Sequence, residues 1–195
     1  RDSSTSRGLG DVYKRQMYYY GSQNKPFVYR CINRLDRDTT GLTIVAKHAL
    51  AGGILGNAVA KRAIHRTYYA VCSGCTPACM RISAPIARKD ASTIERCVDF
   101  KRGENAVTDF IRIKYNPDNN LSLVKLRLLT GRTHQIRVHM KYIGFPLIGD
   151  FLYNPDYTYI SRQALHSGRL VFTHPVTGQK MNLISDIPSD MKSLF

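Results

Sequence analysis

Residues 33–42, which read NRLDRDTTGL, place an acidic side chain where it could act as a reactive carboxylate. Asp36 lies between Arg34 and Arg37, and a neighbouring arginine favours the ionised form of a carboxyl group. Gly41 allows the tight backbone that would lift such a loop into a cleft. An ionised carboxylate can attack a carbon atom or remove a proton. Taken alone, however, the same string is also typical of a charged turn before a strand.

A second polar group, residues 131–139, reads GRTHQIRVH and is predicted to begin a helix. Backbone N–H groups at a helix start attract anions, and Arg132 and Arg137 add positive charge there. His134 and Gln135 add hydrogen-bonding groups. An arginine at a helix start is mildly unfavourable with the helix dipole, which indicates that an anion compensates it. A solvated basic first turn would have the same composition, and both interpretations stay open.

The charge balance narrows the class of partner. The 195 residues include 29 lysines and arginines against 14 acidic residues, a formal net charge of +15. This excess favours a polyanionic partner, with nucleic acid first, an acidic membrane surface second and a merely solvated basic surface as the simpler alternative. The sequence has no run of about 18 apolar residues that could span a bilayer. We therefore expect nucleic acid and no membrane.

The cysteines give a weak metal pattern. Cys72, Cys75 and Cys79 are closely spaced, but no fourth ligand follows at a recognisable zinc spacing. The chain has five cysteines, an odd number, and no apolar signal segment at its start. Reduced thiols and a cytoplasmic location are the expectation from this pattern.

Histidines and aspartates offer two further metal arrangements. His134 and His139 are five residues apart, which on a helix separates them by about 140° and puts them on different faces. Asp36, Asp38 and Asp150 could form the metal site of a nuclease. This is the alternative enzyme, and chelators would abolish its activity. We expect neither a metal nor a cofactor.

Hydrophobic periodicity and turn residues predict the elements that position these groups. Strands are expected over residues 42–47, 67–72, 94–100, 106–115, 121–130, 169–174 and 180–184, and helices over residues 48–62 and 133–143. Thr133 is expected to cap the second helix and Gly144 to end it. Many hairpins with few helices predict an α+β domain built on a mostly antiparallel sheet.

Residues 1–16, RDSSTSRGLGDVYKRQ, show neither helical nor strand periodicity. They resemble translated adaptor sequence at the ends of assembled gene fragments, and we expect a disordered leader foreign to the fold. They hold four basic and two acidic residues, so residues 17–195 keep a formal charge of +13. That length fits one compact domain.

Together, these strings resemble the motifs of the RluA/RluD-type RNA pseudouridine synthases. Residues 33–42 are similar to HRLDxxTSGL, residues 131–150 to GRTHQIRxHxxxxGxPxxGD, residues 66–70 to K-x-Y-x-A, and residues 164–167 to a segment containing LHA or LHS. The resemblance covers residues 17–195, and long strings in the right order are specific. Asn33, Thr40 and Arg66 stand where the family usually has His, Ser and Lys.

The resemblance implies a pseudouridine synthase catalytic domain, with flanking helices and a central RNA-binding cleft. Such enzymes isomerise uridine in structured RNA without a cofactor, by an aspartate-dependent mechanism with base flipping. Large-subunit ribosomal RNA is favoured over transfer RNA, and the expected state is a monomer. The family usually opens with a strand well before the aspartate motif, and many members carry a small RNA-binding domain; both are expected to be missing here. An RNA-binding domain without catalysis is therefore the alternative.

The resemblance also implies roles for three residues around the target base. Asp36 falls on the catalytic aspartate. Arg34 falls on an arginine that fills the gap left by the flipped base, and Tyr68 falls on a tyrosine that packs on the target ring.

Four further residues are expected to bind RNA or support the site. Arg137 best matches the arginine that pairs with the catalytic aspartate, and Arg132 is the second claimant. Gln135 lies between them in the motif. Leu165 is expected to form an apolar wall of the pocket.

Overall fold

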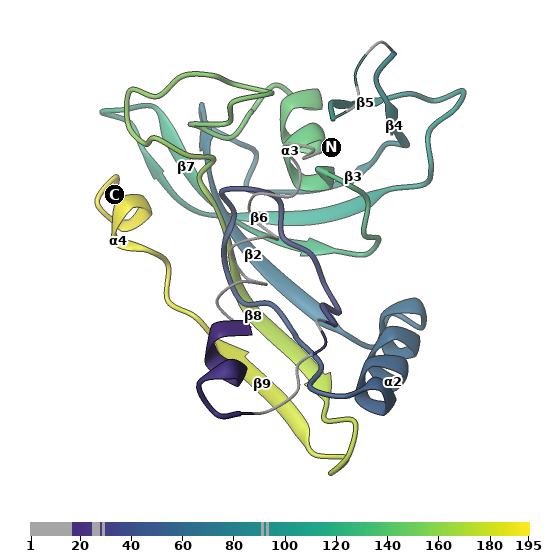
Figure 1. Ribbon diagram of the computed structural model, residues 1–195. Coiled ribbons are helices and arrows are strands. Elements are labelled where there is room, and N and C mark those ends of the chain that lie inside the picture. Colours follow the sequence, from purple (N-terminus) through teal and green to yellow (C-terminus); the bar gives the residue numbers. More distant parts are fainter. Residues whose placement is uncertain (1–16, 25–27, 29, 91, 93) are drawn as a thin grey trace.

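The computed structural model describes residues 17–24, 28, 30–90, 92 and 94–195, and a seven-stranded sheet forms its centre (Figure 1). The strands are β1 (Thr40–Gly41), β2 (His65–Ser73), β3 (Cys79–Ser83), β6 (Val107–Asn116), β7 (Leu121–Leu128), β8 (Leu165–Thr173) and β9 (Lys180–Ile184). Their order is β1-β8-β2-β7-β6-β3, and β9 also pairs with β8. The β1–β8 pair is parallel and the other described pairs of this sheet are antiparallel. The predicted α+β class with a mixed, mostly antiparallel sheet is confirmed.

The remaining elements lie outside this sheet. β4 (Ile86–Arg88) and β5 (Arg96–Val98) form a separate two-stranded ribbon. The labelled helices are α2 (Ala49–Ala60), α3 (Gln135–Tyr142) and α4 (Ser189–Lys192), and residues 17–21 are also helical. In Figure 1, α3 lies near the β4–β5 ribbon, whereas α2 lies toward the other end of the molecule. Of the helices that the structure describes, none is long and apolar enough to cross a membrane.

Side chains alternate across β2 and join the sheet to helices on both faces. Tyr68 and Ala70 point into the main hydrophobic core, which also contains Ile136 and Met140 of α3. Val71, on the opposite face, packs in a cluster that includes a residue of α4. Full burial of one large apolar side chain contributes about 1.5–3 kcal/mol, so the apolar stripe of α3 holds this helix firmly on the sheet.

Several predicted elements are confirmed, with changed ends. β6 and β7 form the hairpin expected around residues 116–120, β8 and β9 form the second hairpin, and α2 lies within residues 48–62. The strand expected over residues 94–100 is shortened to β5. β1, β3, β4, α4 and the helix of residues 17–21 were not predicted.

The predicted strand over residues 42–47 is wrong. Ile44 and Ala46 are buried, as the apolar run suggests, but the segment makes only an isolated bridge, Cys31 to Val45. The Ile44 N–H donates to the side chain of Asn33 at 2.8 Å instead of to a neighbouring strand. Burial therefore produced the apolar pattern without a β ladder.

The predicted cap of the second helix is also wrong. Its N-cap is His134, which has a left-handed backbone with φ 56° and makes no side-chain cap hydrogen bond. Thr133 lies in the preceding turn. Gly144, with φ +84°, follows the C-cap residue as expected. The start differs because the side chain of Gln135 accepts a hydrogen bond from the Arg132 N–H at 2.9 Å and fixes the turn from inside.

Candidate active site

The loop before β1 carries Asp36 and is fixed against β8. Thr40 and Gly41 pair with His166 and Ser167 in the parallel β1–β8 contact. Gly41 has φ +105°, and a Cβ atom there would overlap the backbone of Ser167. Glycine is therefore required, because only it combines this backbone angle with so close an approach.

The buried side chain of Gln163 also holds this loop in place. Its Nε2 donates to the backbone oxygen of Arg37 and to Thr39 Oγ1, both at 2.7 Å. These bonds lie on either side of Asp38, whose φ is +68°. Sequence reasoning missed Gln163, which lies two residues before the recognised Leu165 and carries no pattern of its own.

A chain of three charged groups forms the centre of the site. Arg137 Nε and Nη2 donate to the two carboxylate oxygens of Asp150, each at 2.7 Å. Arg137 Nη1 lies 3.4 Å from Asp36 Oδ2. The side chains of Arg137 and Asp150 are 1% and 0% exposed, whereas that of Asp36 is 26% exposed. Of these three charged groups, only Asp36 can be reached by solvent or substrate. Arg137 presents one edge of its guanidinium to it.

The environment keeps this arginine charged. Burial by itself would lower the pKa of Arg137, but hydrogen bonds to Asp150 and the charges of Asp150 and Asp36 outweigh it, and the pKa is raised. Asp150 also accepts the backbone N–H groups of Leu152 and Tyr153 at 3.1 and 3.2 Å. Asp150 was considered in the sequence only as a metal ligand. Its place in the GD end of the 131–150 motif could have indicated a partner for a buried arginine.

Asp36 lies in a cleft of about 860 Å³ that is strongly basic. Asp36 is the only Asp or Glu among the described residues that line the cleft. The lining arginines are Arg34, Arg37, Arg62, Arg66, Arg127, Arg132 and Arg137. Arg34, Arg62, Arg66 and Arg127 form no salt bridge with a carboxylate in the described part of the chain. The cleft therefore favours a polyanion.

Tyr68 and Leu165 form an apolar part of the cleft wall and are 5% and 4% exposed. The β2–β8 register shifts between Thr67 and Tyr68, and Gly168 lies opposite this irregularity. A Cβ atom at Gly168 would collide with the ring of Tyr69, so the shift depends on this glycine. Burial raises the pKa of Tyr68, which keeps its hydroxyl protonated.

The other expected site residues lie in the same cleft but differ in their contacts. Arg34 is exposed and borders it. Arg132 forms a salt bridge with Glu104, not with Asp36. Gln135 is buried, and both ends of its amide bond internally, including Nε2 to the Val107 oxygen at 3.0 Å. Gln135 therefore supports the loop instead of reaching a ligand.

His134 borders the cleft and contacts Tyr153, a residue that sequence reasoning missed. His134 Nδ1 lies 3.0 Å from Tyr153 Oη, and the backbone N–H of Arg96 donates to the same oxygen at 2.9 Å. With that oxygen accepting from Arg96, the hydroxyl proton can be donated to His134 Nδ1. Burial lowers the pKa of His134 to about 4, so its ring is neutral at pH 7.

The carboxylates of the rival nuclease site are engaged separately. Asp38 pairs with Arg37 at the surface, and Asp150 pairs with Arg137 in the interior. Cys72 is buried within β2, and burial raises the pKa of its thiol, whereas Cys75 and Cys79 are exposed. Among the described residues, no three His, Cys, Asp or Glu side chains are grouped to hold a metal ion.

Comparison with solved structures supports the fold. The human protein named RNA Pseudouridylate Synthase Domain Containing 1 matches with a TM-score of 0.77, over 90% of this chain and 73% of that chain, at 24% identity. A second human protein, RNA Pseudouridylate Synthase Domain Containing 4, matches with a TM-score of 0.72 at 20% identity. At these identities the likeness concerns the fold.

Comparison with known sequences identifies the family. The uncharacterized RNA pseudouridine synthase YjbO of Bacillus subtilis is 47% identical over 166 residues, 84% of this chain and 57% of that protein. Ribosomal large subunit pseudouridine synthase D of Zymomonas mobilis is 37% identical over 174 residues, 84% of this chain and 54% of that protein. The chain thus spans a little over half the length of these relatives. A profile of the family described as RNA pseudouridylate synthase matches residues 3–142, and the chain therefore belongs to this family.

Proposed function

We propose that this protein is an RNA pseudouridine synthase, an isomerase that converts uridine to pseudouridine in structured RNA. One observation carries the proposal. A partly exposed carboxylate, Asp36, lies in a cleft lined by seven arginines and by no other described carboxylate. One of them, Arg137, contacts Asp36 and is held in place by its buried salt bridge with Asp150. Family membership supports the reaction type.

The reaction requires one reactive carboxylate. The N1–C1′ bond of uridine breaks, the uracil turns, C5 bonds to C1′, and the proton on C5 moves to N1 in the net change. No atom is lost and no redox change occurs, so the reaction requires neither an oxidant nor a reductant. Asp36 either attacks the nucleotide covalently or removes a proton to form an unsaturated intermediate, and both routes need its ionised form.

Arg137 keeps Asp36 reactive when RNA closes the cleft. Excluding water would favour a neutral carboxyl group, and a nearby cation opposes this change. The 3.4 Å contact is long for a charge-assisted hydrogen bond, so it holds the carboxylate loosely. The tight bonds of Arg137 go to Asp150 and set the orientation of the arginine.

The target base must leave its stack to reach Asp36, which requires roughly a few kcal/mol. Tyr68 offers an aromatic face for the uracil, and Leu165 offers an apolar wall beside it. Arg34 is exposed at the border of the cleft, where it can fill the gap that the base leaves. Cleft arginines without acidic partners bind the surrounding phosphates.

His134 supplies a hydrogen-bond donor to the base. In this proposal the hydroxyl of Tyr153, 3.0 Å from Nδ1, is the donor of that contact, which puts the proton of the neutral ring on Nε2. Nε2 makes no hydrogen bond with a described residue. Uracil carbonyl oxygens are acceptors of the right kind for such a group. Tyr153 thereby acts as a positioning residue that selects the tautomer of His134.

Large-subunit ribosomal RNA is the proposed substrate, since several relatives carry that RNA in their names. We propose that the protein acts as a monomer in the cytoplasm. An RNA-binding role without catalysis is the alternative, and it predicts RNA binding without any product.

The decisive experiment incubates the protein with unmodified bacterial ribosomal RNA and maps pseudouridine chemically. The wild type should modify a defined uridine, and Asp36→Asn should lower the rate at least about 1000-fold. Asp38→Asn is a matched control, because it removes a nearby carboxylate that pairs with Arg37 at the surface. It should keep near wild-type activity. RNA binding without product from the wild type would support the binding-only alternative.

A further inference from the structure

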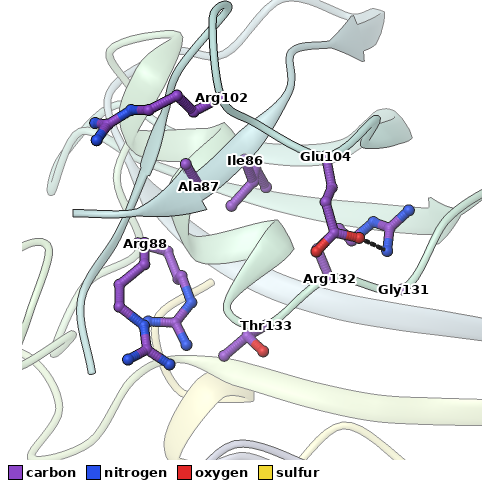
Figure 2. A pocket seen from close by; sticks show the side chains of 9 residues that line it. Ile86, Ala87, Arg88, Arg102, Glu104, Gly131, Arg132 and Thr133 are labelled. Carbon is purple, nitrogen blue, oxygen red and sulfur yellow. Dashed lines mark hydrogen bonds and ion pairs between the residues drawn. The ribbon is translucent and has the colours of Figure 1, made fainter. Parts of the chain in front are cut away.

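A second hollow, a pocket of about 470 Å³, lies beside the catalytic cleft (Figure 2). The β4–β5 ribbon forms one side of it. Gly131, Arg132 and Thr133 form another side and also line the cleft. The pocket and the cleft therefore share the loop before α3 as a common wall.

Two arginines face each other across the ribbon at this pocket. Arg88 of β4 and Arg96 of β5 are direct partners in the antiparallel register. Like charges directly opposite one another destabilise a pair of strands. The side chain of Arg88 is exposed and makes no hydrogen bond or ion pair with a described residue. The side chain of Arg96 donates, among the described residues, only to the neutral backbone oxygens of Ile94 and Glu95, at 3.2 and 3.1 Å.

Three neighbouring cations, in contrast, each have an acidic partner. The pairs are Lys89 with Glu95, Arg102 with Asp90 and Asp99, and Arg132 with Glu104. Figure 2 shows the last of these contacts, with Arg88 apart from it near Thr133. Arg88 and Arg96 are thus selectively left without a carboxylate, although four are close by. A ligand with negative charge would remove the repulsion between them.

We propose that Arg88 and Arg96 clamp a backbone phosphate of the RNA strand that enters the cleft, beside the target uridine. The inference rests on the proposed function, because it takes RNA as the ligand. Guanidinium groups suit this task, since each can give two parallel hydrogen bonds to phosphate oxygens. The shared loop of residues 131–133 puts this phosphate next to the nucleotide in the cleft. The clamp therefore contributes to binding of the strand beside the cleft.

The test compares wild type with Arg88→Gln, Arg96→Gln and the double variant. Binding to a labelled fragment of unmodified bacterial large-subunit ribosomal RNA is measured over a series of salt concentrations. Arg169→Gln is the matched control, because this arginine of β8 lies outside both hollows and bonds to the neutral side chain of Asn182. One lost phosphate contact reduces the slope of log K against log salt by about 0.7–0.9, which is about 5- to 8-fold in Kd at 0.1 M salt.

The double variant should show this lower slope and a higher KM with unchanged kcat, while the control matches wild type. The Tm of Arg88→Gln without RNA should be no lower than that of wild type, because this change relieves the repulsion and removes no hydrogen bond with a described residue. A wild-type slope in the double variant, an equal change in the control, or a clearly lower Tm of Arg88→Gln would each overturn the clamp. Arg88→Gln alone keeps the test valid if Arg96 proves necessary for folding. The salt slope is measured whether or not pseudouridine forms, so failure of the clamp and failure of the proposed reaction are distinguishable.

Discussion

Replacing Asp150 by asparagine should destabilise the protein strongly, because Arg137 would lose its buried counter-charge. Both side chains of the pair are essentially inaccessible, and two bonds of 2.7 Å join them. Removing one partner of such a pair leaves an uncompensated buried charge and costs about 3–5 kcal/mol. Asparagine keeps an oxygen for the N–H groups of Leu152 and Tyr153, so the loss reports mainly on the ion pair.

The magnitude is large relative to the whole fold. A folded domain is stable by about 5–15 kcal/mol, so this variant would lose at least about a fifth of its stability. For a domain of this size each kcal/mol shifts Tm by about 2–4 °C, which gives a Tm lower by roughly 6–20 °C. A displaced Arg137 would also misplace Asp36, and a shift of about 1 Å at a reacting group can cost about 100-fold in rate.

Urea unfolding at pH 7 measures the stability, and pseudouridine formation measures the rate. Asp36→Asn is the contrasting variant, because its 3.4 Å contact is partly exposed and should contribute about 1 kcal/mol or less. We expect Asp150→Asn to lose stability and part of its activity, and Asp36→Asn to lose activity with little change in stability. If Asp150→Asn unfolded within about 1 kcal/mol of wild type, the buried pair would not have the role given to it here.

Two further perturbations test the neutral histidine and its partner. Tyr153→Phe removes the hydroxyl that contacts His134 Nδ1, so kcat should fall about 10-fold or more with KM little changed; an unchanged kcat would refute the positioning role. Burial lowers the pKa of His134 to about 4 and also lowers that of His139, so below about pH 6.5 the unfolded chain binds more protons than the folded one. Stability should therefore be full above pH 6.5 and fall as the pH drops toward 4, and a Tm at pH 5 equal to that at pH 7 would contradict this.

The elements with strong local signals could be predicted from the sequence. Alternating apolar and polar residues, together with turn residues, predicted the β6–β7 and β8–β9 hairpins. The prediction succeeds because side chains on one face of a strand come from every second residue and the turns are short. The strings that contain Asp36 and Arg137 could be recognised as family motifs, because each motif keeps its residue types at fixed spacing in the sequence.

Local patterns failed where a distant contact decided the backbone. The run 42–47 is apolar because it is buried, yet its hydrogen bonds go partly to a side chain, and so it forms no ladder. His134 replaced Thr133 as the helix cap because the amide of Gln135 holds the turn from the interior. Propensity describes a residue and its neighbours, whereas these outcomes depend on groups brought in by the fold.

Only the tertiary structure brought the charges of the site together. Asp36 and Arg137 are 101 residues apart, and Asp150 holds Arg137 through a salt bridge whose burial no sequence pattern reveals. Nothing in the sequence distinguishes Arg88 and Arg96 from the other arginines; the β4–β5 pairing places them opposite each other. The sequence determined which groups could do chemistry; packing decided which charges are buried, which are paired and which remain for RNA, because the energy of a charge depends on its surroundings.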